Sequence, residues 1–192
     1  MVKSIMTSSS NIGYLELIIG PMFSGKTSRL VEVFKQCKFC NINVSVINHS
    51  IDKRYDNELL STHDKIKIPC IQIERIRDFW NETNMVNNLI GDVILINEGQ
   101  FFEDLYECVI EMLEKGIKVY VCGLDGDFER KKFGAILDLI PLCDKVNKLT
   151  SLCSICKNGT AGIFSMRLTN EKEQTVVGSD NYIPVCRKCY KK

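Results

Sequence analysis

Residues 20–27 limit most strongly what this chain can fold into, because they match the pattern G-x-x-x-x-G-K-[S/T]. An apolar run over residues 14–19 precedes the motif, and a segment with helical periodicity begins at Ser28. In this setting backbone N–H groups close on phosphate oxygens, and the helix dipole favours the same anion. A glycine-rich turn that matches by chance is the alternative. We predict a nucleotide-phosphate site, with Lys26 on the phosphates and Thr27 on Mg²⁺, formed by Gly20, Pro21, Met22, Phe23, Ser24, Gly25, Lys26 and Thr27.

Apolar runs alternate with helix-period segments over the first 150 residues, a pattern typical of a parallel sheet covered by helices. We expect strands near residues 14–19, 43–48, 67–73, 92–97 and 117–123, with a weaker sixth at 146–149. We expect helices over 28–39, 75–89 and 103–115. The polar, serine-rich start predicts a flexible tail over residues 1–12. A change of composition after Leu149 predicts an α/β P-loop domain over 13–150 and a small zinc-binding domain over 151–192.

Charge and composition narrow the class of partner. The chain has 25 basic and 24 acidic residues, and it therefore lacks the basic excess that drives nucleic-acid binding. Its N-terminus has no apolar core of a secretory signal, and no stretch is apolar for long enough to span a bilayer. We expect a soluble, cytoplasmic protein without a nucleic-acid or membrane partner. In that compartment the ten cysteines favour thiols and metal ligands over disulfides.

Two cysteine pairs near the C-terminus have the spacing of a closed structural zinc site. They are Cys153-x-x-Cys156 and Cys186-x-x-Cys189. Residues 157–185 between the pairs exceed the roughly 15 to 20 of a compact ribbon, so this segment must loop out and return. We interpret it as a lid over a ligand, anchored at both ends by zinc and containing Ser165, Arg167, Val176, Val177, Gly178 and Tyr182.

Cys37-x-x-Cys40 is a third pair of the same spacing. Both residues fall on the apolar stripe of the helix after the P-loop, which favours buried thiols over metal ligands. The remaining cysteines, which are Cys70, Cys108, Cys122 and Cys143, lie in strand or helix patterns and are expected in the core.

Glu98 follows the most apolar predicted strand. Ligands of parallel sheets gather at the carboxyl ends of the strands, so Glu98 should face the phosphates. It could take a proton from an acceptor hydroxyl, as in a kinase, or orient a water, as in an NTPase; capping of the next helix is the third possibility. Asn97 stands where many P-loop proteins carry the Asp that helps to hold Mg²⁺.

Asp52 and Arg54 lie in a loop after the second expected strand, at the same edge of the sheet. Arg54 could neutralise charge on the transferring phosphoryl group, and a solvated charge cluster is the equal alternative. Asp52 could contribute to Mg²⁺ binding.

Seven motifs occur in the order of one family. They are GPMFSGKT, DKRY (52–55), THD (62–64), EGQFF (98–102), LDGDFERKKFGAIL (124–137), KLT (148–150) and the terminal cysteine pairs. Together they resemble the type II, cellular and poxvirus-like thymidine kinases from about Gly13 to the C-terminus. The resemblance implies ATP-dependent phosphorylation of the 5′-hydroxyl of thymidine and deoxyuridine, a zinc-bound lasso, a homotetramer and feedback inhibition by dTTP.

The same resemblance assigns roles to residues. It implies that Glu98 is the general base, that Lys26, Thr27 and Arg54 serve the phosphates and the metal, and that Asp52 and Gln100 meet the deoxyribose. The thymine base would lie among Met22, Phe101, Leu124, Phe128, Phe133 and Tyr182, with Ser165, Val176 and Gly178 completing the pocket.

Three departures from the family pattern concern Asn97, Ser165 and the lasso. Asn97 replaces an acidic residue, Ser165 stands where Thr is common, and residues 177–180 read VGSD where a Gly-Gly pair is frequent. Two other functions stay open: a P-loop ATPase with a zinc ribbon, and a non-catalytic nucleotide-binding module.

Overall fold

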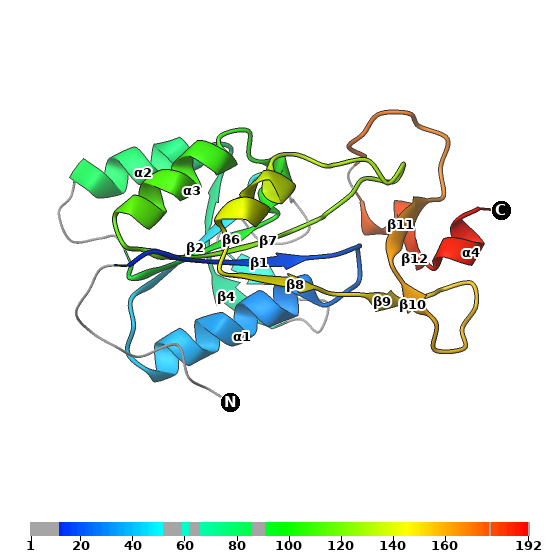
Figure 1. Ribbon diagram of the computed structural model, residues 1–192, viewed down its shortest axis with the longest axis horizontal. Coiled ribbons are helices and arrows are strands. Elements are labelled where there is room, and N and C mark those ends of the chain that lie inside the picture. The colour runs from blue at the N-terminus through cyan, green and yellow to red at the C-terminus, as the bar shows by residue number, and fades with distance from the viewer. Residues whose placement is uncertain (1–11, 52–58, 62–65, 86–90, 177, 192) are drawn as a thin grey trace.

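The computed structural model describes residues 12–51, 59–61, 66–85, 91–176 and 178–191 (Figure 1). The tail predicted over residues 1–12 therefore lies outside the described residues except for Ile12, which is exposed. Asp52 and Arg54, and the motifs over 52–55 and 62–64, also lie outside them.

Six parallel strands form the central sheet, which confirms the predicted fold class. Their order is β5-β2-β6-β7-β1-β8. The central strand β6 is buried at all five positions, as its unbroken apolar sequence predicts. The strands are β1 (Tyr14–Ile19), β2 (Val44–His49), β5 (Ile71–Ile73), β6 (Val93–Asn97), β7 (Lys118–Gly123) and β8 (Lys145–Lys148).

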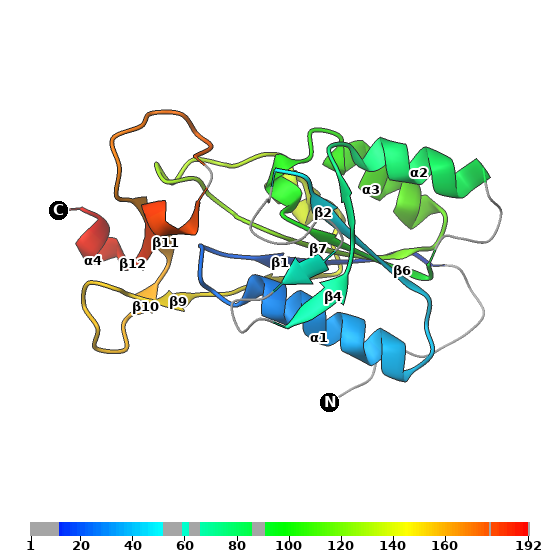
Figure 2. The ribbon, with the colours of Figure 1, turned by 180° about the vertical axis from the view of Figure 1, so that it is seen from behind.

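Helices cover both faces of the sheet and make three layers (Figures 1 and 2). Helix α1 (Lys26–Phe39) lies on one face, and α2 (Ile76–Met85), α3 (Leu105–Glu114) and the 3₁₀ segment η2 (Ile136–Leu142) lie on the other. Side chains of β1 alternate accordingly, because Leu15 and Leu17 pack toward α2 and α3 while Ile18 packs toward α1. The short 3₁₀ turn η1 (Gly99–Phe101) follows β6.

The prediction of one strand over residues 67–73 is wrong, because two strands occupy this range. Strand β4 (Lys67–Pro69) pairs antiparallel with β3 (Leu59–Ser61) in a separate two-stranded sheet, whereas β5 joins the edge of the central sheet. Pro69 has no N–H to donate, so a continuous ladder through this point is disfavoured and the chain changes sheets at Cys70.

Two small hairpins and a short helix form the C-terminal region. Strand β9 (Ser151–Leu152) pairs with β10 (Ala161–Gly162), and β11 (Phe164–Arg167) pairs with β12 (Tyr182–Val185). The turn η3 (Ser179–Asn181) precedes β12, and α4 (Arg187–Tyr190) ends the described chain. Figure 1 shows this region beyond the carboxyl end of β1, where the P-loop begins. The domain boundary near Thr150 stays a prediction.

Asp104 links the two helices on one face. Its carboxylate accepts the N–H groups of Ile76 at 3.1 Å and Arg77 at 2.9 Å, the first two residues of α2, although Asp104 itself precedes α3. The unpaired amides of a helix start favour such an acceptor, and the negative charge also suits the positive end of the helix. Asp104 therefore fixes where α2 begins relative to α3.

We expect Asp104→Ala to lower the free energy of unfolding by about 1 kcal/mol, because two helix-start amides lose their acceptor. Asp104→Asn keeps one oxygen and should lose less. Urea unfolding followed by circular dichroism measures both. Asp138→Ala, which removes an exposed ion pair with Lys132, is the control and should change stability by less than about 0.5 kcal/mol. Equal losses for the Asp104 and Asp138 variants would contradict the capping role.

Candidate functional site

One cleft opens where the carboxyl ends of β1, β6 and β7 meet the β11–β12 hairpin. The P-loop, the β6 end, the loop after β7, residues 174–176 and Gly178 all contribute to its walls. Most of the site residues predicted from the sequence line this cleft. They are Met22, Phe23, Ser24, Gly25, Lys26, Thr27, Asn97, Glu98, Gln100, Phe101, Leu124, Phe128, Phe133, Ser165, Val176, Gly178 and Tyr182. Gly20 and Pro21 belong to the P-loop without lining the cleft, and Asp52 and Arg54 lie outside the described residues.

The P-loop has the backbone conformation of an anion cradle. Gly25 has φ 80°, and a Cβ at this position would meet nothing within 4 Å, so the conformation alone requires glycine. Helix α1 begins at the next residue, Lys26, and its first N–H groups lie at the loop. The Lys26 ammonium and the Ser24 hydroxyl both donate to the Pro21 carbonyl at 2.8 Å. The loop thus holds its cationic side chain beside the place where phosphates would bind.

Glu98 occupies a strained corner directly after β6. Its φ of 54° and ψ of 40° are left-handed, which costs a non-glycine residue about 1–3 kcal/mol and is typical of functional positions. Its Oε2 accepts a hydrogen bond from Gln100 Nε2 at 2.7 Å, and Gln100 Oε1 accepts the N–H of Leu124 at 2.9 Å. The corner turns the carboxylate into the cleft, where it could accept a proton.

Asn97 supplies a buried oxygen to the cleft. Its Nδ2 donates to Asn48 Oδ1 at 2.8 Å, but its own Oδ1 accepts no hydrogen bond within the part of the chain that the structure describes. A buried acceptor without a donor costs about 1–3 kcal/mol. This oxygen and the Thr27 hydroxyl are ligand types that suit Mg²⁺, and the residues present therefore fit the ion.

Aromatic side chains form an apolar wall beside Glu98. The rings of Phe101 and Phe133 meet edge to face, with centroids 5.4 Å apart. His49 lies against Phe101 at 5.6 Å, and burial lowers its pKa. Its Nδ1 accepts the N–H of Ile51 at 3.1 Å, which favours the neutral ring. This wall suits a flat, mostly apolar ring.

Arg167 organises the segment over residues 168–181, which we call the lasso. Its guanidinium donates to the carbonyls of Glu171, Glu173 and Gln174 at 2.9, 2.6 and 3.0 Å. It also donates to the Tyr182 hydroxyl at 2.7 Å, and that hydroxyl donates to the Val176 carbonyl at 3.2 Å. Sequence patterns gave Arg167 no role, and in the structure its hydrogen bonds hold the lasso together.

The hairpin that carries the lasso contacts one wall of the cleft, and the lasso itself contacts another. Ser165 Oγ accepts the N–H of Met22 in the P-loop at 2.9 Å. Gln174 Nε2 donates to Asp127 Oδ2 at 2.8 Å, while Asp127 Oδ1 accepts the N–H groups of residues 129 and 131. Sequence reasoning missed Asp127 and Gln174. The turn-forming Asp-x-x-x-Lys stretch was a signal for the first, but nothing local marked the second.

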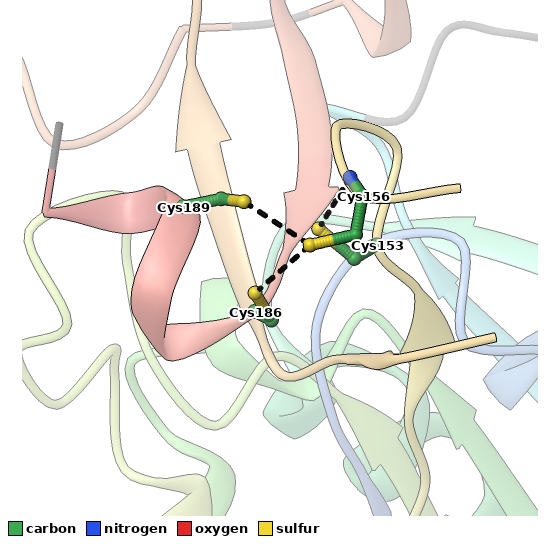
Figure 3. A group of neighbouring side chains, drawn as sticks. All are labelled: Cys153, Cys156, Cys186 and Cys189. Carbon is green, nitrogen blue, oxygen red and sulfur yellow. Dashed lines mark hydrogen bonds between the residues drawn. The ribbon is translucent and has the colours of Figure 1, made fainter. Parts of the chain in front are cut away.

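Four cysteines converge from the β9–β10 connection and the start of α4 (Figure 3). Their sulfurs lie within 4.8 Å of one another, and Cys156 Sγ is 3.7 Å from Cys186 Sγ and 3.3 Å from Cys189 Sγ. Tetrahedral zinc thiolates have sulfurs about 3.8 Å apart, so the cluster of Cys153, Cys156, Cys186 and Cys189 fits one zinc ion. Backbone N–H groups, that of Cys156 foremost, lower the pKa of Cys153 to about 6, which favours the thiolate that zinc binds.

The cysteine cluster lies next to the cleft through helix α4. Tyr190 follows Cys189 and donates its hydroxyl proton to the Phe128 carbonyl at 2.5 Å. The Arg167 guanidinium lies 3.6 Å from the centroid of the Phe128 ring. Phe128 is therefore held both by the cysteine-bearing helix α4 and by Arg167.

The other cysteines, apart from Cys40, pack in or against the core. Cys37, Cys108 and Cys122 are buried, and burial raises the pKa of the Cys108 and Cys122 thiols to about 12. Cys70 and Cys143 are partly buried against the core on opposite faces of the sheet. These positions agree with the expected role of small apolar side chains. The expectation of a buried thiol is wrong for Cys40, which is half-buried at the end of α1.

Within the described residues, no helix combines the length and the apolar character that crossing a membrane requires.

Comparison with known proteins identifies the family. A family model described as thymidine kinase matches residues 13–190. A thymidine kinase of Yaba monkey tumor virus (strain VR587) is 40% identical over 183 residues, which are 95% of this chain and 97% of the viral protein. Bovine (Bos taurus) cytosolic thymidine kinase is 40% identical over 95% of this chain and 74% of its own. A rice (Oryza sativa subsp. japonica) thymidine kinase is 40% identical over 93% of this chain, which spans 66% of the rice protein. With nearly the whole chain matched, this protein belongs to the thymidine kinase family.

Proposed function

We propose that this protein transfers the γ-phosphate of ATP to the 5′-hydroxyl of thymidine, and of deoxyuridine, to give the nucleoside monophosphate in nucleotide salvage. The observation that carries the proposal is the meeting of three parts in one cleft: a phosphate cradle, a carboxylate at a strand end and an aromatic wall under a lasso. Family membership supports the same reaction.

The catalytic step follows from the positions of Lys26 and Glu98. Glu98 takes the proton of the 5′-hydroxyl while that oxygen forms a bond to the γ-phosphorus. The bond from the γ-phosphorus to the bridging oxygen breaks, and ADP leaves with the electron pair. The Lys26 ammonium and the P-loop amides stabilise the charge on the phosphoryl oxygens. Arg54, outside the described residues, would add a second cation there, as the family resemblance implies.

The nucleoside would bind between the aromatic wall and the lasso. Phe101 and Phe133 present an apolar surface to the thymine ring, and Met22, Leu124, Phe128 and Tyr182 complete the pocket. The lasso backbone near Val176 and Gly178 offers polar groups to the edge of the base. Closing the lasso over this pocket would exclude water, which favours transfer to the nucleoside over hydrolysis of ATP. Asp52, outside the described residues, would meet the sugar.

Two metal ions belong to the proposal. Thr27 and Asn97 would hold Mg²⁺, which neutralises charge on the nucleotide phosphates when it is bound. Cys153, Cys156, Cys186 and Cys189 would hold a structural zinc ion. The homotetramer, the inhibition by dTTP and the cytoplasmic location rest on the family resemblance, and the bovine relative is named as cytosolic.

One assay distinguishes a nucleoside kinase from the two other functions that the sequence left open, a P-loop ATPase and a non-catalytic nucleotide-binding module. The protein is incubated with ATP, Mg²⁺ and a panel of nucleosides, and ADP release is compared with the rate without nucleoside. We expect release only with thymidine or deoxyuridine. Release that is indifferent to the nucleoside would support a P-loop ATPase, and no release under any condition would support a binding module.

In the same assay, Glu98→Gln should lower kcat by about 10²- to 10⁴-fold, because the amide cannot take the proton of the 5′-hydroxyl. Nucleotide affinity should stay close to that of the unchanged protein, since the P-loop is intact. Glu103→Gln, which alters an exposed carboxyl outside the cleft, is the matched control. Full turnover in Glu98→Gln would refute its role as the base.

Asn97→Asp should lower the Mg²⁺ concentration for half-maximal activity by roughly threefold or more, because a negative charge attracts the ion more strongly than an amide oxygen. Direct titration of Mg²⁺ in the presence of a non-hydrolysable ATP analogue gives a second readout. The control Asn158→Asp makes the same change at an exposed position in the C-terminal region. An unchanged or higher Mg²⁺ requirement would count against Asn97 as a ligand.

Removal of zinc should weaken thymidine binding by at least about tenfold, because the cysteine cluster anchors the hairpin that carries the lasso and the helix that holds Phe128. Calorimetric titration with thymidine before and after chelation measures the change. Return of affinity after zinc is restored is the control for irreversible damage. Intact thymidine affinity in zinc-free protein would refute the anchoring role.

A further inference from the structure

The side chain of Tyr190 reaches from the C-terminal helix α4 to the wall of the cleft. Its hydroxyl donates to the Phe128 carbonyl at 2.5 Å. Its backbone N–H is bonded within the helix, to the Cys186 carbonyl at 3.0 Å. The ring packs against the buried core around the four cysteines and meets the Phe164 ring edge to face, with centroids 5.4 Å apart. The hydroxyl is therefore presented from a fixed base.

The turn over residues 127–131, which contains the acceptor, is closed on itself. The Asp127 carboxylate accepts the N–H groups of Glu129 and Lys131 at 2.9 Å each. The Asp127 N–H donates to the Lys131 carbonyl at 2.9 Å, and the Arg130 N–H donates to the Asp127 carbonyl at 3.0 Å. Because these bonds lie within the turn, we expect it to shift as one unit.

Three contacts from the C-terminal region hold this turn against the cleft. Tyr190 bonds to its backbone. The Arg167 guanidinium lies 3.6 Å from the centroid of the Phe128 ring, and the Gln174 amide donates to the Asp127 carboxylate at 2.8 Å. Arg167 and Gln174 belong to the hairpin and the lasso, whereas Tyr190 reaches the turn from α4, by a separate route.

Arg130 makes a second contact between the turn and α4. Its φ of 68° is left-handed, a conformation that is unfavourable for a non-glycine residue and persists only where the surroundings hold it. Its guanidinium lies 4.3 Å from the centroid of the Tyr190 ring, which is a cation–π contact. The ring and the hydroxyl of one tyrosine therefore meet the turn at two different points.

We propose that Tyr190 is a positioning residue for the nucleoside pocket, because its hydroxyl fixes the turn that carries Phe128 into the cleft. This inference rests on the proposed function, which places the thymine base against Phe128. When the binding-competent arrangement is populated only in part, the apparent Kd rises by the inverse of that fraction. Freeing the turn should therefore weaken thymidine binding and leave phosphoryl transfer in the bound complex unchanged.

The test is Tyr190→Phe, which removes the hydroxyl and keeps the ring for Arg130 and Phe164. We expect the Kd for thymidine, from calorimetry, to rise about 3- to 10-fold, the range that corresponds to one net hydrogen bond. At saturating thymidine, kcat should stay within about twofold of that of the unchanged protein. Tyr14→Phe is the matched control, since it removes a hydroxyl that donates to Glu16 at 2.8 Å, outside the cleft.

A double variant tests whether the hydroxyl acts through Phe128. In a Phe128→Ala background, Tyr190→Phe should raise the Kd for thymidine by less than about twofold further, because the ring that it positions is already gone. Metal analysis of Tyr190→Phe should give the same zinc content as the unchanged protein, since the four cysteines are intact.

Three results in the variants would overturn the proposal. An unchanged thymidine Kd in Tyr190→Phe would show that the hydroxyl does not shape the pocket. Losses that multiply in the double variant would show that it acts on another part of the site. A raised Kd together with a loss of zinc would assign Tyr190 to the stability of the cysteine cluster. Failure of the unchanged protein to bind thymidine is a distinct result, which would refute the proposed function and this inference with it.

Discussion

The site depends on the order of three neighbouring parallel strands. β7 pairs with β1 on one side and with β6 on the other, so the loops after all three strands open at the same edge. The P-loop follows β1, Glu98 follows β6, and Leu124 follows β7. Glu98 and the P-loop are more than 70 residues apart in the sequence, and the pairing of these strands brings them to one edge of the sheet.

The C-terminal region adds a further wall to the cleft, which the loops of the parallel sheet do not form by themselves. The lasso has little regular structure, and its carbonyl groups need donors when it folds over the cleft. Arg167 supplies several donors from one planar group, and its 9% exposure means that its charge is held among hydrogen-bond acceptors and the Phe128 ring. The cysteine cluster holds the base of the same hairpin.

Sequence patterns predicted the sheet, its helices, the P-loop and the cysteine cluster, because each depends on local periodicity or short spacing. The strand pattern failed at Pro69, where a missing N–H interrupts an otherwise apolar run. The role of Arg167 and the pairing of Gln174 with Asp127 could not be predicted, since both depend on a long loop returning to a distant element. The orientation of Gln100 could not be predicted either, because it is set by Leu124 and by space at Gly123.

The hydrogen bond from Met22 N–H to Ser165 Oγ joins the P-loop to the hairpin that carries the lasso. If the P-loop binds nucleotide and this hairpin covers the nucleoside, as proposed, a ligand that shifts this amide would change the affinity for the other ligand. Linkage is reciprocal, and the factor by which one ligand changes the affinity of the other must be the same in both directions. The Ser165 hydroxyl would then couple the occupancy of the two halves of the cleft.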